Sequence, residues 1–265
     1  MPVTHTARTG TRYQDRGSGP ALLLVHGHPF DHTMWQPQID RFSRTHRVVA
    51  PDLRGYGATP LGAGTGRTGL DVFADDLVAL LDELGIDECV LAGLSMGGQI
   101  AMELYRRHPG RVRGLVLADT FPAAETEDGR KARNALADRL LAEGMRGYAD
   151  EVLDRMVAPY NTHAAPPVHR MMCATDPVAA AAALRGRAER PDYRETLTAV
   201  AVPALVVVGR DDTYTPVADA EEMHALLPDS TLVVVERAAH LPNLERPEEF
   251  DAALDRFLRS LVRPN

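Results

Sequence analysis

The chain has 265 residues, a formal net charge of -8 at pH 7, and 45% hydrophobic residues. These values are ordinary for a globular enzyme, and the length allows one domain with an inserted subdomain. The acidic balance, together with the lack of a lysine and arginine cluster, argues against nucleic acid and anionic membranes as partners.

Alternating strands and helices are predicted along most of the chain. An N-terminal strand pair near 4–8 and 11–15 precedes apolar segments typical of buried strands, at 21–25, 46–50, 89–92, 112–118, 203–208 and 231–235. Helices are expected at 34–43, 70–84, 96–107, 216–227 and 247–261. The pattern predicts an α/β fold, with a mostly parallel eight-stranded sheet covered by helices on both faces.

Residues 121–200 depart from this alternation. Their helical periodicity is interrupted by prolines, and no strand is predicted among them. We interpret this segment as a helical cap inserted into a core formed by residues 1–120 and 201–265. The cap is expected to lie over the carboxyl ends of the strands, where sites in parallel sheets collect.

The start of the chain and its cysteines suggest where the protein works. The N-terminus lacks a basic segment followed by an apolar core, and no apolar run reaches membrane-spanning length, so we expect a cytoplasmic protein. Cys89 and Cys173 are expected to be unpaired thiols. No cysteine and histidine spacing resembles a zinc site, and the sequence predicts neither a metal nor a cofactor.

The segment Gly93 to Gly97 reads Gly-Leu-Ser-Met-Gly and joins a predicted strand to a predicted helix. In such a turn the central residue takes a strained backbone conformation, and the flanking glycines let strand and helix approach closely. Ser95 would then project its Oγ above the sheet, beside the amide of Met96 at the helix N-terminus. Ser95 is therefore the candidate nucleophile.

A serine nucleophile needs a base, and an acid that orients the base. Among the ten histidines, His240 is preferred, because it follows both Ser95 and an acid at a strand end and lies in a loop after the predicted strand 231–235. Two acids compete after the predicted strand 203–208. Asp212 is preferred because it lies in the loop beyond the strand, and Asp211 is the fallback.

A second backbone N–H group is required to bind the oxyanion. The predicted strand 21–25 ends in His26-Gly27-His28-Pro29, where Gly27 has no side chain to block the turn and Pro29 has no N–H to offer. The amide of His28 is thus the expected second donor, alongside that of Met96. His26 is expected to pack beneath the turn, and the His28 side chain is either a pocket group or a loop residue.

These motifs resemble those of the α/β-hydrolase family. The matching segments are 26–29, 51–57, 93–98, 209–216 and 239–247, and they most resemble small bacterial esterases, 3-oxoadipate enol-lactonase-like hydrolases and cofactor-free perhydrolases. The resemblance implies Ser95, Asp212 and His240 as a catalytic triad and the amides of His28 and Met96 as an oxyanion hole. A serine nucleophile disfavours the haloalkane dehalogenase and epoxide hydrolase activities of this fold, which use aspartate.

The activity expected is hydrolysis of small carboxylic esters or lactones through an acyl-enzyme intermediate, of the carboxylesterase or lactonase type. The alternatives are perhydrolysis or haloperoxidase-type activity, carbon–carbon bond hydrolysis, and a ligand-binding receptor on the same fold. The oligomeric state is left open. An apolar pocket is expected, and its candidate residues are Phe30, Trp35, Phe121, Met156, Tyr160 and Leu241.

Overall fold

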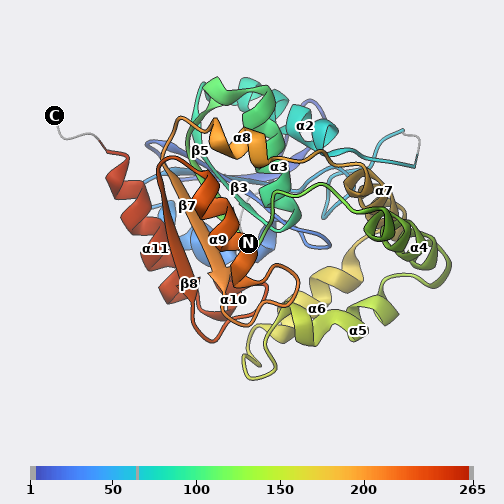
Figure 1. Ribbon diagram of the computed structural model, residues 1–265. Coiled ribbons are helices and arrows are strands. Elements are labelled where there is room, and N and C mark those ends of the chain that lie inside the picture. The colour runs from blue at the N-terminus through green and yellow to red at the C-terminus, as the bar shows by residue number, and fades with distance from the viewer. Residues whose placement is uncertain (1–3, 64–65, 263–265) are drawn as a thin grey trace.

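The computed structural model describes residues 4–63 and 66–262 (Figure 1). Its strands are β1 (Thr4–Thr6), β2 (Arg12–Arg16), β3 (Ala21–Val25), β4 (Arg47–Pro51), β5 (Cys89–Leu94), β6 (Val112–Ala118), β7 (Ala204–Gly209) and β8 (Ser230–Val235). They form one eight-stranded sheet in the order β1-β2-β4-β3-β5-β6-β7-β8. Strand β2 is antiparallel to β1 and β4, and the remaining pairs are parallel. The predicted fold class is confirmed.

The helices are α1 (Gln36–Phe42), α2 (Leu70–Glu83), α3 (Met96–Arg107), α4 (Glu127–Glu143), α5 (Arg146–Met156), α6 (Ala165–Ala174), α7 (Pro177–Ala188), α8 (Arg194–Thr198), α9 (Val217–Leu226), α10 (Pro242–Glu245) and α11 (Pro247–Ser260), with 3-10 turns η1 (His32–Trp35) and η2 (Pro109–Arg111). The single helix expected over 34–43 is instead η1 followed by α1. Pro37 explains the break, because proline fits the first turn of a helix and disrupts its interior. None of the helices in residues 4–63 and 66–262 combines the length and the apolar composition that a membrane span requires.

Two apolar clusters lie on opposite faces of the sheet, because successive strand side chains point to opposite sides. Leu22 and Leu24 of β3 belong to one cluster, which includes residues of α11. Leu23 and Val25 belong to the other, which includes residues of α2, α3, α8 and α9. Figure 1 shows α2, α3 and α8 on one side of the sheet and α11 on the other.

The connection between β6 and β7 contains α4 to α8. Helices α4, α5, α6 and α7 lie together beyond one end of the sheet in Figure 1, whereas α8 contacts α3 and α9. Leu197 of α8 is fully buried in the same cluster as core residues of α3. We therefore propose that the cap comprises α4 to α7 and that α8 belongs to the core.

The parallel strands direct the candidate site residues to one edge. The turn at His26–His28 follows β3, Ser95 follows β5, Asp212 comes after β7 and His240 comes after β8. Because the carboxyl ends of parallel strands meet at the same edge of a sheet, residues far apart in the chain are brought close together there.

Candidate active site

Ser95 occupies the turn between β5 and α3 with φ 57° and ψ -117°, a backbone conformation that residues other than glycine rarely adopt. Its backbone N–H donates to the carbonyl of Ala118 at 2.9 Å, which fixes the turn against β6. A Cβ at Gly93 would lie 2.1 Å from the carbonyl oxygen of Gly97, and one at Gly97 would lie 2.2 Å from that of Val25. Both glycines are therefore required for the close approach of strand and helix.

The hydroxyl, imidazole and carboxylate expected from the sequence form one hydrogen-bonded chain. Nε2 of His240 lies 2.9 Å from Oγ of Ser95, and Nδ1 of His240 lies 2.7 Å from Oδ2 of Asp212. All three side chains are buried. If Nδ1–H donates to the carboxylate, Nε2 is left free to accept the serine proton.

Asp212 is held as an anion by several donors. Its carboxylate accepts hydrogen bonds from the hydroxyl of Thr215 and, at 2.7 Å, from the backbone N–H of Tyr214. Burial raises the pKa of Asp212, but the charge and hydrogen bond of His240, with the hydrogen bonds from Thr215 and Tyr214, outweigh burial and lower it. The fallback acid, Asp211, instead accepts a hydrogen bond from the hydroxyl of Tyr160.

The two expected oxyanion donors flank the serine. Met96 begins α3 directly after Ser95, and a Cβ on Gly27, the residue before His28, would lie 3.2 Å from Cβ of Ser95. Among residues 4–63 and 66–262, the backbone N–H groups of His28 and Met96 have no protein acceptor. Both donors are consequently available to a ligand oxygen.

His26 supports this turn from below. Its Nδ1 lies 2.8 Å from the carbonyl of Gly27, and its Nε2 accepts from the backbone N–H of Leu53 at 2.9 Å. Burial lowers the pKa of His26, so the ring is neutral and able to accept. These two contacts tie the turn after β3 to the segment after β4.

Ser95, His28 and His240 border a cavity of about 320 Å³ between the sheet and the cap. Phe121 and Met156 also line it, as the sequence predicts. The remaining lining residues are Arg133, Leu136, Tyr148, Glu151, Val152, Arg155, Leu184, Arg187, Tyr214 and Thr215. The wall is mainly apolar, as expected, but four charged side chains, Arg133, Glu151, Arg155 and Arg187, also contribute to it.

Phe30, Trp35, Tyr160 and Leu241 are not among the residues that line this cavity. The side chains of Phe30, Trp35 and Leu241 pack in the apolar core, where the Trp35 ring lies 5.9 Å from that of Phe250. Tyr160 is 49% exposed. These four predictions are corrected: adjacency to a motif in the chain does not determine which way a side chain points.

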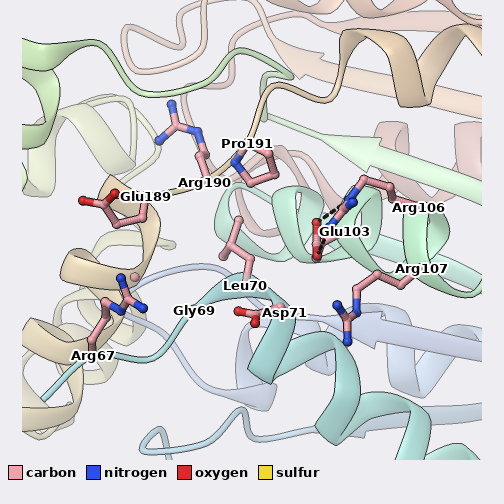
Figure 2. A pocket seen from close by; sticks show the side chains of 11 residues that line it. Arg67, Gly69, Leu70, Asp71, Glu103, Arg106, Arg107, Glu189, Arg190 and Pro191 are labelled. Atoms are coloured by element: carbon pink, nitrogen blue, oxygen red, sulfur yellow. Dashed lines mark hydrogen bonds and ion pairs between the residues drawn. The ribbon is translucent and has the colours of Figure 1, made fainter. Parts of the chain in front are cut away.

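A second hollow, of about 340 Å³, lies between α2, α3 and the end of α7 (Figure 2). Its lining includes none of the residues expected to carry chemistry. Three of its four arginines have carboxylate partners: Arg106 pairs with Glu103 at 2.8 Å, Arg107 with Asp75 at 2.9 Å, and Arg190, which points away from the hollow in Figure 2, reaches Glu125 at 2.8 Å. The fourth, Arg67, is exposed to solvent. We assign no reaction to this hollow.

Comparison with known proteins gives the family. Residues 22–253 match the model of the alpha/beta hydrolase family. The chain belongs to the α/β-hydrolase family. It is 30% identical over 250 residues to 3-oxoadipate enol-lactonase 1 of Acinetobacter baylyi, covering 92% of this chain and 90% of that protein.

Other members of the family support the same placement. A pimeloyl-acyl carrier protein methyl ester esterase of Aliivibrio salmonicida is 30% identical over 261 residues, covering 95% of this chain and 97% of the relative. A malate-bound thermophilic esterase from Thermogutta terrifontis superposes with a TM-score of 0.93 and 34% identity, covering 99% and 100% of the two chains. The predicted resemblance is confirmed, and this hydrolase has esterases and a lactonase among its relatives.

Asp119 lies beside Asp212 and His240 in the candidate site, and the sequence reasoning missed it. It follows β6, its Oδ1 accepts from the backbone N–H of Gly209 at 2.8 Å, and its Oδ2 is buried without a partner in the described part of the chain. One carboxylate oxygen lies within 4.8 Å of both an Asp212 oxygen and a His240 ring nitrogen. Burial, and then the negative charge of Asp212, raise the pKa of Asp119 well above 3.8. The only sequence signal is an acid at a strand end.

Asp119→Asn is expected to gain stability relative to the parent as pH rises. In the folded parent the Asp119 carboxyl keeps its proton well above pH 3.8, whereas in the unfolded parent it loses the proton near that pH. Rising pH therefore stabilises the unfolded state of the parent, and it has no such effect on the asparagine variant. Urea unfolding between about pH 5 and pH 8 should show the difference growing by up to about 1.4 kcal/mol per pH unit. The exposed Asp229→Asn serves as control. Parallel stability curves for Asp119→Asn and the parent would contradict this charge state.

Glu245 is a second missed residue, and it anchors the loop that carries His240. Each carboxylate oxygen accepts two hydrogen bonds of 2.8 to 3.2 Å. The donors are the backbone N–H groups of Ala158, Ala239 and Leu241 and the side chain of Asn161. Two of these donors flank His240, and the other two follow α5. The carboxylate therefore joins the histidine loop to the cap.

Glu245→Gln is expected to lower the free energy of unfolding by about 2–4 kcal/mol, because an amide nitrogen would face buried N–H donors. The kcat for a small ester should fall roughly tenfold as the His240 loop loosens. Glu249→Gln is the matched control, since that carboxylate is an exposed partner of Arg246 and should contribute about 0–1 kcal/mol. Equal effects of the two substitutions would refute the anchoring role.

Proposed function

We propose that this chain hydrolyses small carboxylic esters or lactones through an acyl-enzyme on Ser95. The observation that supports this most directly is the relay of 2.9 Å from Ser95 to His240 and 2.7 Å from His240 to Asp212. In this proposal His240 takes the serine proton as Oγ attacks the carbonyl carbon, and Asp212 stabilises the imidazolium. The free amides of His28 and Met96 stabilise the oxyanion.

After the attack, His240 changes from a base to an acid, and in the second half of the reaction it acts as a base again. His240 gives its proton to the leaving alcohol oxygen, which leaves the acyl group on Ser95. His240 then removes a proton from water as the water oxygen attacks the acyl carbon. It returns that proton to Oγ of Ser95 as the bond between Oγ and the acyl carbon breaks and the acid is released. In a lactone the leaving oxygen stays tethered to the acyl group through the carbon chain, so this hydrolysis releases a single ring-opened acid. The esterase and lactonase names of the relatives support both substrate classes.

The test is to trap the acyl-enzyme. Mixing the protein with p-nitrophenyl acetate or butyrate should release a burst of one p-nitrophenol per chain, and acid-quenched protein should carry the acyl group on the peptide containing Ser95. Turnover without acyl transfer to Ser95 would overturn the proposal. Labelling of Ser95 by a fluorophosphonate, without turnover of any ester or lactone, would instead indicate a receptor.

A further inference from the structure

The cavity beside Ser95 carries an excess of positive charge. Its wall holds three arginines, Arg133, Arg155 and Arg187, and one carboxylate, Glu151. That carboxylate is already paired, since Glu151 accepts from Arg139, a residue outside the wall, at 2.5 Å. The wall therefore favours an anionic ligand, although the chain as a whole has a net negative charge.

Two of these arginines have partners in the protein. Arg133 forms an ion pair with Glu125. The guanidinium of Arg155 stacks on the ring of Tyr214, with its central carbon 3.9 Å from the ring centroid. Both arginines contribute to the positive electrostatic potential in the cavity, but contacts with other side chains of the protein already hold them in place.

Arg187 differs from them because it is buried without an acid. Its side chain is on α7, only 7% of the residue is exposed, and its single hydrogen bond within the described chain is from Nε to Gln99, at 3.1 Å. No carboxylate of a described residue lies within 4.0 Å of its nitrogens. A guanidinium stays protonated in proteins, so a buried one without a counter-ion favours an anionic ligand.

A second unpaired polar group lies on the same wall. Nε2 of His28 is buried without a partner in the described residues, while its Nδ1 lies 2.7 Å from the hydroxyl of Tyr56. Burial, and then the charges of Arg187 and Arg133, lower the pKa of His28, so the ring is neutral. The positive charges of Arg187 and Arg133 thus help to keep the His28 ring neutral, beside the backbone N–H that flanks Ser95.

We propose that Arg187 binds a carboxylate of the substrate, so that the preferred substrate is a small ester or lactone carrying a free carboxylate. This inference rests on the proposed function. A planar guanidinium takes a carboxylate through two parallel hydrogen bonds, and Arg133 strengthens the attraction. The hollow in Figure 2 offers no such group, because three of its arginines are paired with carboxylates and the fourth, Arg67, is exposed to solvent. Only the Ser95 cavity is therefore assigned an anion.

The first test compares two p-nitrophenyl esters of similar size: the glutarate monoester, which carries a carboxylate, and the neutral pentanoate. The parent protein should favour the glutarate monoester in kcat/KM, and Arg187→Gln should lose about 30-fold or more of that preference. Arg187→Lys should keep part of it, because the charge remains. Arg185→Gln, on the same helix and paired with Asp138 at 2.6 Å, should keep the full preference.

A second measurement does not depend on turnover. Calorimetric titration with glutarate should show binding to the parent, and binding weakened about 30-fold or more in Arg187→Gln. Equal kcat/KM for the two esters in the parent, or glutarate binding unchanged by Arg187→Gln, would overturn the carboxylate inference and leave the proposed hydrolysis intact. Failure of the proposed function would appear differently, as absence of an acyl group on Ser95 with both esters.

Discussion

Replacing Ser95 by alanine is expected to lower kcat for p-nitrophenyl acetate and butyrate by about 10⁵–10⁶-fold, with KM little changed. The substitution removes only Oγ, the atom 2.9 Å from His240, and leaves the cavity walls in place. Alanine keeps the same Cβ, so the strain of φ 57° is unchanged and the protein should melt at the temperature of the parent.

His240→Ala should lose a similar factor, and the double variant should lose hardly more than either single variant. Residues that act as one unit show this non-additivity, since the serine is unreactive once its base is gone. Unchanged turnover in Ser95→Ala would contradict the assignment of the nucleophile. Effects that multiply in the double variant would mean that serine and histidine act independently.

Much of the framework follows from the sequence alone. The observed bounds of β3, β6 and α3 coincide with the predicted ones, because apolar runs and the glycines around Ser95 mark strand and helix directly. The prediction that Ser95 and His240 lie close together uses one further rule, that parallel strands place their carboxyl ends at one edge. Local pattern and sheet topology together were sufficient for these residues.

The cavity wall could not be predicted in the same way. Arg187 lies in the proline-interrupted segment, where only tertiary packing decides which face of α7 meets the core. Trp35 adjoins a motif in sequence, yet its ring packs on Phe250 of α11 and not in the cavity. Side-chain direction depends on contacts from distant segments, and hydrophobicity and chain position carry little information about it.

The charge state of Asp119 also could not be predicted from the sequence. Its pKa is raised by burial and by Asp212, a residue 93 positions later that follows a different strand. A single acid at a strand end gives no indication of that neighbour. Glu245 is a similar case, because two of its four donors come from the cap.

Asp212→Asn is expected to lower kcat by about 10⁴-fold, and Asp211→Asn is its matched control. An asparagine at 212 presents either its NH₂ group or a weaker acceptor to Nδ1 of His240. The histidine tautomer that accepts the Ser95 proton is then disfavoured, and the imidazolium loses its counter-charge. Asp211 bonds to Tyr160 instead, so Asp211→Asn should retain activity within about threefold of the parent.

Asp119 gives this prediction a second part. The negative charge of Asp212 helps to keep Asp119 protonated, so removing that charge lowers the pKa of Asp119 and favours a carboxylate close to His240. The residual activity of Asp212→Asn should therefore rise with pH, and adding Asp119→Asn should remove that rise. A residual activity independent of both pH and Asp119 would show that the carboxyl after β6 cannot act on the imidazole. A large loss in Asp211→Asn with little loss in Asp212→Asn would exchange the roles of the two acids.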